Sequence, residues 1–208
     1  MNDAKFAKLL VTVNGLIPLG LLSWDALRGE LGANAVSRAL HTTGNLALIF
    51  FLLSLAVTPL QKLTRYSLLI ATRRPLGLLA FLYAVLHVGI YVTLDRAFNL
   101  SSTLYELATR RYLQLGLLAL LLMVPLAITS TDKMIRRMGS KRWKKLHRLA
   151  YVSATLAATH YYMQTKADVS LPIAFASVLA GLLVCRVILY SLKKAPAAES
   201  GRKRPGVL

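Results

Sequence analysis

The sequence has few of the residues on which most hydrolytic and metal-dependent active sites depend. It contains one cysteine, Cys185, and only eight aspartates and glutamates in 208 residues. One thiol cannot form an internal disulfide or a Cys-x-x-Cys motif, and Cys185 lies in an apolar run where it is most simply a packing residue. No His-Glu-x-x-His motif occurs, which disfavours a zinc protease. The acidic residues lie outside the apolar runs, which weakens proton-pump and cation-channel interpretations.

Long apolar runs dominate the rest of the sequence, which is 56% hydrophobic and has a mean hydropathy of +0.54. The runs are about 17–25 residues long, the length of a membrane-spanning helix. They cover approximately 4–24, 41–60, 75–94, 112–130, 146–163 and 171–190. We therefore predict an all-α, six-transmembrane-helix bundle within residues 1–194 and a disordered basic cytoplasmic tail over 195–208. Because little of the chain remains for a soluble domain, we expect any catalytic head to be a separate chain.

The net charge of +18 is unevenly distributed between the apolar runs. Most of the 26 lysines and arginines lie near the N-terminus, in the second and fourth connections, and at the C-terminus. The positive-inside rule places these segments, and with them both termini, in the cytoplasm. A basic membrane face also attracts anionic lipids, which explains the charge more simply than nucleic-acid binding does.

Prolines and glycines suggest where the helices begin and end. Pro59 is expected to end the second span, and Pro75 is expected to begin the third. Gly139 is expected to divide the basic segment after the fourth span into two short pieces. The outer connection, 95–111, is long enough for a short helix of its own.

Histidines are the strongest functional signal in this apolar chain: His41, His87, His147 and His160. An ionisable residue in hydrocarbon is costly unless something binds it, and neutral imidazole is a common axial ligand of haem iron. His87 lies 12 residues past Pro75 and His160 lies 14 past Leu146, roughly 18 and 21 Å above the inner helix ends. We predict that these two histidines ligate one haem iron from opposite sides. The structural alternative is a hydrogen bond from each to a neighbouring helix.

The inner half of the membrane offers a less symmetric set of residues. His147 lies 13 residues before His160, which places it roughly 20 Å deeper toward the cytoplasm. It is either a ligand of an inner cofactor or a histidine at the level of the lipid headgroups. Arg73 and Arg74 stand where a symmetric two-haem bundle would have a second histidine, and they would suit an inner haem or a flavin phosphate. His41 begins the second span near the outer surface. We expect it to be an interfacial residue, with contact to the haem propionates or an alternative ligand role as the competing interpretations.

Three stretches of sequence resemble a known family. They are IATRRPLGLLAFLYAVLH, the TPL at the end of the second span, and TSTDKMIRRMGSKRWKKLHRLAYVSATLAATHYY with its His-x12-His spacing. They are similar to the ferric-reductase-like transmembrane domain family, and within it to the haem-binding membrane subunits of bacterial methionine sulfoxide reductase systems. The resemblance covers nearly the whole chain. It implies a multi-pass haem b protein of the bacterial inner membrane, with His87, His147 and His160 as haem ligands and an arginine pair at Arg73 and Arg74.

The resemblance also implies a direction of electron flow. Electrons would come from the quinone pool or a cytoplasmic flavin reductase, with FMN as a further cofactor. They would leave to a periplasmic molybdopterin subunit (MsrP-like) that reduces methionine sulfoxide in oxidised proteins. Larger relatives carry a fused flavin and nicotinamide domain; none is expected here, which argues against NADPH oxidase activity. A standalone ferric or metal-chelate reductase remains an alternative, as does a non-redox membrane transporter with structural histidines.

Overall fold

The computed structural model describes residues 2–194, and within them every regular element is helical. The predicted tail, 195–208, lies outside the described residues, as do the side chains of 192–194. The long helices are α1 (Asp3–Leu27), α2 (Ala35–Thr64), α3 (Leu69–Ile90, continued by the π-helical turn η1, Tyr91–Asp95), α5 (Arg111–Ile128), α8 (Leu149–Gln164) and α9 (Ser170–Lys194). The short helices are α4 (Leu100–Thr109), α6 (Asp132–Met138) and α7 (Ser140–Leu146).

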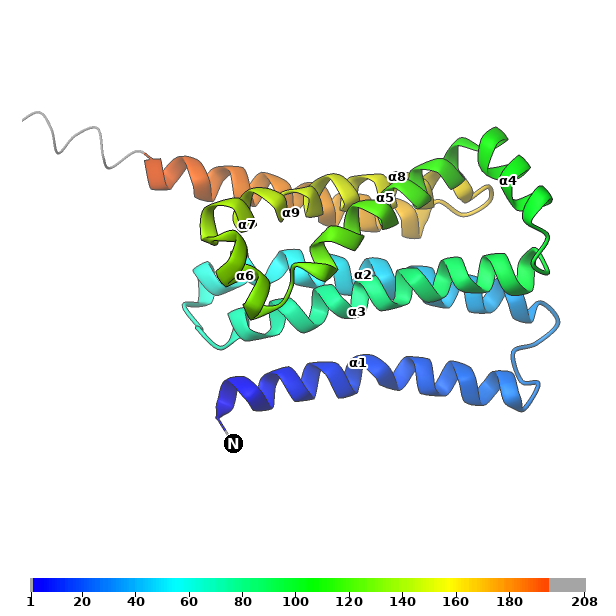
Figure 1. Ribbon diagram of the computed structural model, residues 1–208, viewed down its shortest axis with the longest axis horizontal. Helices are drawn as coiled ribbons and strands as arrows, with labels where there is room; N and C mark the ends of the chain where they lie inside the picture. Colours follow the sequence, from blue (N-terminus) through cyan, green and yellow to red (C-terminus); the bar gives the residue numbers. More distant parts are fainter. Residues whose placement is uncertain (1, 195–208) are drawn as a thin grey trace, which may run out of the picture.

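The long helices run side by side in alternating directions (Figure 1). Two antiparallel pairs form the centre, α2 with α3 and α5 with α8, and α9 packs against α8 and α2. Helix α1 lies at the edge and packs on α3. Helix α4 lies at one end of the bundle, and α6 and α7 lie at the opposite end, together with both ends of the described chain (Figure 1).

Five helical stretches are long and apolar enough to cross a bilayer: Asp3–Leu27, Ala35–Thr64, Leu69–Asp95, Arg111–Ile128 and Ser170–Ser191. Their outward surfaces carry many exposed leucines, isoleucines and valines, as lipid-facing helices do. Helix α8 coincides with the predicted fifth span but has only 16 residues, a rise of about 24 Å. The structure thus supports a multi-pass membrane protein with five clear spans, and α8 is shorter than the roughly 20 residues that a span usually needs.

Two predictions from proline were wrong. Helix α2 continues past Pro59 to Thr64, and α3 begins at Leu69, so that Pro75 lies inside it. Membrane helices tolerate internal proline because neighbouring groups can bond the carbonyls that proline leaves unpaired. Close by, the hydroxyl of Ser54 donates to the Arg73 carbonyl at 3.0 Å, which ties α2 to α3 two residues before Pro75.

Two predictions for the connections were confirmed. Gly139 separates α6 from α7 and has a φ of 77°, in the left-handed region that favours glycine. The outer connection carries the short helix α4. Its first turn is capped by Asn99, whose side chain accepts a bond from the Ser102 amide at 2.9 Å.

Candidate functional site

His87 and His160 come together in the interior of the bundle, from α3 and α8 respectively. Their ring centroids lie 6.3 Å apart, and the two ring planes are nearly perpendicular, at 82°. The two residues are 73 positions apart in the sequence, on the two different helix pairs of the centre. The depth argument from the sequence therefore identified the right pair to meet, while their role as ligands stays a prediction.

Each of these imidazoles is held by a backbone carbonyl of the neighbouring helix. His87 Nδ1 lies 3.0 Å from the Leu40 oxygen on α2, and His160 Nδ1 lies 2.7 Å from the Tyr112 oxygen on α5. A carbonyl oxygen can only accept, so Nδ1 carries the proton in both rings and donates it. This tautomer leaves Nε2 with a free lone pair, the arrangement that metal-binding histidines typically have.

The separation of the rings fits one metal ion between them. A metal–imidazole bond of about 2.0–2.1 Å, added to roughly 1.2 Å from a ring nitrogen to the ring centre, places the centroids of two opposed ligands about 6.4 Å apart. The observed 6.3 Å matches this value. Within the described residues no group of three or more histidine, cysteine or acidic side chains could hold a metal ion. Zinc, which usually takes three or four protein ligands, is therefore a poor match.

A cavity of about 630 Å³ surrounds the two rings. This volume lies within the range of about 300–1,000 Å³ that ligand and cofactor sites occupy. Its deeper wall is apolar and includes Leu48, Phe51, Leu117 and Met123. Polar residues of α4 and of the helix ends next to it also line the cavity: Asn34, Ser37, Asp95, Arg96, Thr103 and Gln164. An apolar chamber with a polar mouth suits a flat macrocycle that carries carboxylates at one edge.

His41 lies on this same polar side of the cavity, in the second turn of α2, and its side chain is exposed. The exposed position fits the interfacial histidine that the sequence predicts. Because it also lies on the cavity wall, contact between His41 and a carboxylate of a bound group stays a prediction.

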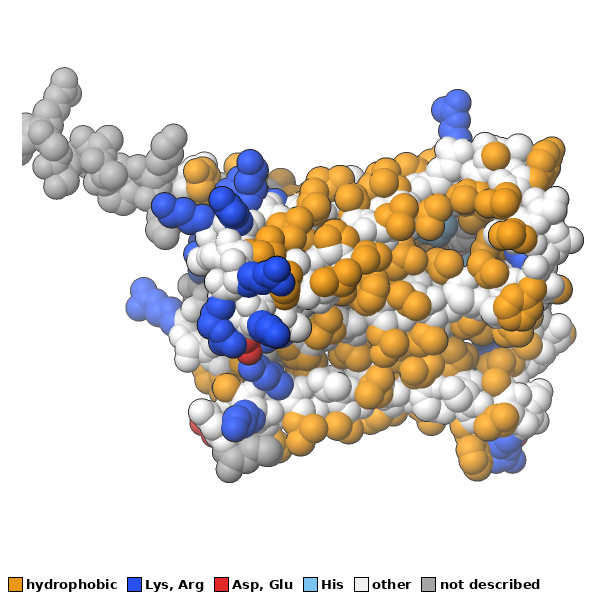
Figure 2. Space-filling view, viewed as in Figure 1, with side chains coloured by type: hydrophobic (Ala, Val, Ile, Leu, Met, Phe, Trp, Pro, Cys, Tyr) orange, Lys and Arg blue, Asp and Glu red, His pale blue; other side chains and the backbone are white. Residues whose placement is uncertain are grey.

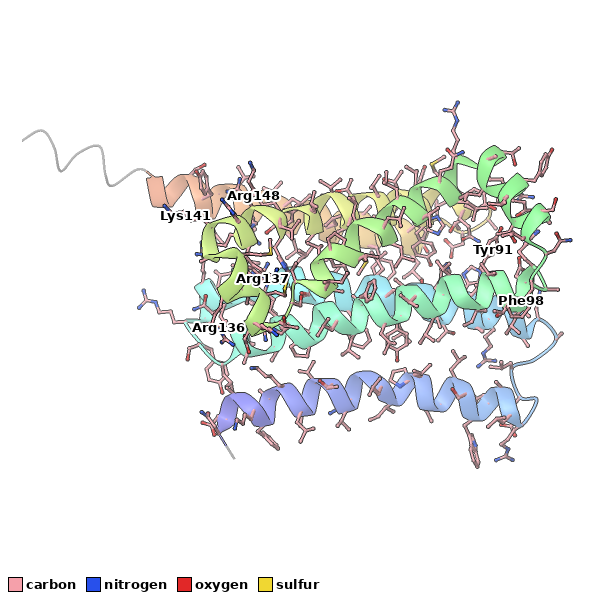
Figure 3. All side chains as sticks on the ribbon, in the orientation of Figure 1. Tyr91, Phe98, Arg136, Arg137, Lys141 and Arg148 are labelled. Atoms are coloured by element: carbon pink, nitrogen blue, oxygen red, sulfur yellow. The ribbon has the colours of Figure 1, made fainter. Side chains whose placement is uncertain are left out.

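A network of charged side chains joins α4 to the mouth of the cavity. The Glu106 carboxylate, only 13% exposed, accepts bonds from the Tyr91 hydroxyl at 2.9 Å and from Arg96 at 2.9 Å, and it pairs with Arg110 at 3.1 Å. Arg96 also pairs with Asp95 at 2.7 Å. Tyr91 lies at the α4 end of the bundle in Figure 3. The network ties α4 to the chain segment that follows α3, and both contribute residues to the chamber wall.

His147 lies apart from this pair, in the junction between α7 and α8, because α8 begins at Leu149 and not near Leu146. Its ring stacks on Trp143 with centroids 3.9 Å apart, and its Nε2 lies 3.2 Å from the Thr129 hydroxyl oxygen. Thr129 already donates to the Pro125 carbonyl at 2.6 Å, so His147 Nε2 is the donor in this contact. The tautomer is thus the reverse of that at His87 and His160.

The surroundings of His147 do not fit a haem iron bound at Nε2, since that nitrogen is occupied and one ring face is covered by Trp143. His147 also does not line the large cavity. Burial and the nearby charge of Arg73 lower the pKa of His147 to about 4, so the ring is neutral near pH 7. Its Nδ1 is the nitrogen left free for a ligand.

The structure separates the two arginines that the sequence paired. Arg73 is partly buried, and its guanidinium lies 3.4 Å from the Thr58 hydroxyl. Arg74 forms an ion pair of 2.6 Å with Asp132 at the start of α6. That guanidinium lowers the pKa of the Asp132 carboxyl. Of the two, Arg73 is the one directed toward the interior.

Basic side chains crowd the end of the bundle that α6 and α7 form (Figure 2). Arg136, Arg137, Lys141 and Arg148 project there in Figure 3, at the opposite end from Tyr91 and Phe98. A further arginine, Arg186 of α9, lies over the ring of Tyr151 at 4.7 Å. The end of the bundle with α6 and α7 therefore carries a strong positive charge with few acids to balance it.

Residues 40–158 match the family model described as the ferric reductase like transmembrane component. This segment contains His41, His87 and His147 and ends two residues before His160. The chain belongs to the ferric reductase like transmembrane family.

Similar members of this family are protein-methionine-sulfoxide reductase heme-binding subunits, MsrQ, of several bacteria. The one from Deinococcus radiodurans is 43% identical over 189 residues, which cover 91% of this chain and 93% of the relative. The one from Rhodospirillum rubrum is 41% identical over 184 residues, 88% of each chain. The one from Herminiimonas arsenicoxydans is 40% identical over 182 residues, 86% of this chain and 84% of the relative.

Sequence reasoning alone missed the groups that hold the histidines. The carbonyls of Leu40 and Tyr112 carry no side-chain signal, and no sequence pattern could have identified them. Gly44 and Gly116 did carry a signal, since glycine inside a long apolar helix is unfavourable and often marks a close approach. Thr129 could not have been linked to His147 without the fold.

Proposed function

We propose that the chain is a membrane haem b electron-transfer subunit. It receives electrons from the quinone pool or from a cytoplasmic flavin reductase. It passes them to a periplasmic molybdopterin-dependent methionine sulfoxide reductase (MsrP-like), which repairs oxidised proteins. The reduction of the sulfoxide takes place in that partner chain.

One observation carries this proposal: two neutral imidazoles from separate helix pairs face each other at 6.3 Å with Nε2 free on both. The chamber around them, apolar inside and polar at its mouth, supports a haem over a bare ion. The names of the similar MsrQ subunits support the same cofactor and the same reductase system.

In this proposal His87 and His160 would hold the haem through Nε2, and each would have one task besides ligation. Their Nδ1–H groups donate hydrogen bonds to the carbonyls of Leu40 and Tyr112. These bonds fix the ring orientation and make Nε2 a more basic metal ligand. Two imidazoles held in this way would leave no iron position for oxygen, so the pair would favour electron transfer over oxygen binding. When bound, the haem supplies reversible one-electron chemistry.

The proposal includes an orientation in the bacterial inner membrane. We count α8 as the sixth span, since it lies among the other long helices and packs against α5 along the bundle. The basic end, with α6, α7 and both ends of the described chain, faces the cytoplasm, as the positive-inside rule requires. The cavity mouth and α4 then face the periplasm, where the partner docks.

A second cofactor near the cytoplasmic end belongs to the proposal as well. It is either FMN, with its phosphate near Arg73, or an inner haem with His147 as its one histidine ligand. The positive charge of Arg73 and Arg186 supports an anionic group there. The bond from His147 to Thr129 favours FMN of the two.

Pigment analysis of the purified full-length protein tests the proposal. We expect stoichiometric haem b in the reduced-minus-oxidised spectrum, and we expect His87→Ala and His160→Ala each to remove most of that signal. Thr155→Ala is the matched control, because Thr155 lies on α8 with His160, is exposed and does not line the chamber, and it should keep the signal.

Two outcomes would contradict the proposal. A colourless protein would favour the non-redox transporter, in which the histidines are structural. Turnover of ferric chelates at full rate without any partner protein would favour the standalone metal-chelate reductase.

A further inference from the structure

The two facing histidines are held against their neighbouring helices in the same way, and each ring lies over a glycine. A β-carbon added at Gly116 of α5 would lie 2.9 Å from His160 Nδ1 and 3.0 Å from its Cε1. A β-carbon added at Gly44 of α2 would lie 3.2 Å from both Nδ1 and Cε1 of His87. The first distance is too short for carbon, and the second requires the ring to move.

The register of each contact is also the same. His87 bonds the carbonyl of Leu40, four residues before Gly44, and His160 bonds the carbonyl of Tyr112, four residues before Gly116. In an α-helix the carbonyl four residues earlier is the ordinary partner of the glycine amide. The imidazole Nδ1–H therefore joins a carbonyl that the helix already uses.

The direction of side chains on a helix explains why glycine is needed there. The Cα–Cβ bond tilts toward the helix N-terminus, so a side chain covers the turn that precedes its own residue. At positions 44 and 116 any β-carbon would lie over the very carbonyl that the histidine bonds. Without one, the ring can approach the backbone closely enough to reach the oxygen.

We infer that Gly44 and Gly116 are positioning residues that set the place and tilt of the His87 and His160 rings as ligands. The inference rests on the proposed haem function and extends it to two residues that do not touch the iron. The same arrangement occurs on both helix pairs, so each ring is held in its own orientation. Together the two contacts set the angle of 82° between the ring planes.

Alanine at these positions tests the inference. Gly116→Ala should push the His160 ring away from Tyr112, and we expect a loss of haem affinity of about 10–100-fold, as is usual when a ligand's supporting group is disturbed. Gly44→Ala should have a smaller effect in the same direction, because its β-carbon is 0.3 Å less close to the ring. Haem per chain, the ferric electron paramagnetic resonance (EPR) spectrum and the midpoint potential should be measured on the full-length protein in detergent.

Two other helical glycines provide matched controls. Gly89, on α3 with His87, and Gly181, on α9, would meet nothing within 4 Å if changed to alanine. Gly89→Ala and Gly181→Ala should retain the haem content, EPR spectrum and potential of the wild type. The yield of monodisperse protein separates a folding defect from lost ligation, and Gly44→Ala, the milder change, keeps the test valid if Gly116→Ala does not fold.

The failure of this inference is distinguishable from that of the proposed function. If folded Gly44→Ala and Gly116→Ala retain the wild-type haem content, EPR spectrum and potential, the glycines do not position the ligands. If the wild type holds no haem, or keeps it after both histidines are changed, the haem proposal itself fails.

Discussion

The imidazole planes of His87 and His160 stand at 82° to each other, with the centroids 6.3 Å apart. The two hydrogen bonds to Leu40 and Tyr112 lie on different helices, so neither ring is free to rotate toward a common plane. A ferric iron between nearly perpendicular imidazoles has nearly degenerate orbitals and a strongly anisotropic low-spin EPR signal. We expect this signal from the oxidised protein in frozen solution. A rhombic signal typical of parallel imidazoles would contradict the geometry.

The contact between His147 and Thr129 leads to a second prediction. Thr129→Val removes the acceptor for His147 Nε2 and the hydroxyl that bonds Pro125, and we expect it to lower the free energy of unfolding by about 1–3 kcal/mol. Thr129→Ser keeps the hydroxyl and should be close to wild type. Thermal unfolding in detergent measures the difference.

Neither substitution at Thr129 should change the absorbance of the haem proposed at His87 and His160, because His147 does not line that chamber. His147→Ala should likewise leave that absorbance in place and affect an inner cofactor alone. Complete loss of haem in His147→Ala would show that the two regions are not separate.

The different partners of Arg73 and Arg74 predict different effects on an inner anionic cofactor. Arg73→Gln removes a partly buried charge directed to the interior, so the amount of bound flavin should fall severalfold. A loss of this size corresponds to less than about 1.4 kcal/mol of binding free energy, which is a factor of ten in affinity. Arg74→Gln removes a charge that Asp132 already neutralises, and flavin should be retained. Fluorimetry of flavin released from equal amounts of protein measures both. Equal losses in the two variants would contradict the assignment.

The ion pair between Arg74 and Asp132 also makes stability depend on pH. Arg74 lowers the pKa of Asp132 in the folded state, so folding favours the ionised carboxylate. The stabilisation is present above the unfolded pKa, about 4, and is lost as the pH falls through the folded value. Asp132→Asn should therefore have a slightly lower melting temperature than wild type at pH 7, and the gap should narrow as the pH falls below about 4. A gap of constant size from pH 7 to pH 3 would show that the ion pair does not contribute.

The sequence predicted the helices that coincide with long apolar runs, because the length of such a run can be counted without knowledge of the fold. The spans around His87 and within α5 and α9 lie where the runs lie. The helix ends were less well predicted, since Pro59 and Pro75 stop helices in water but are tolerated where neighbouring helices bond the freed backbone groups. The short α8 and the displaced His147 follow from a break after α7 that no proline or glycine marks.

The sequence could predict that the two histidines of the candidate site meet, but not which groups hold them. Depth along two helices is enough to suggest that His87 and His160 meet. Their tautomers depend on the carbonyls of Leu40 and Tyr112, which belong to other helices and have no signature in the sequence. For the same reason the opposite tautomer of His147 could not be anticipated, because it is set by Thr129, 18 residues away.

The division of the bundle into two helix pairs has a consequence for biogenesis. One pair, α2 with α3, carries His87 and its carbonyl, and the other, α5 with α8, carries His160 and its own. In the proposed function, a metal bound by both rings would join the two helix pairs across the cavity that lies between them. Cofactor insertion would then add a covalent link between the two pairs, so the order in which helices assemble and cofactor enters would matter for the maturation of the bundle.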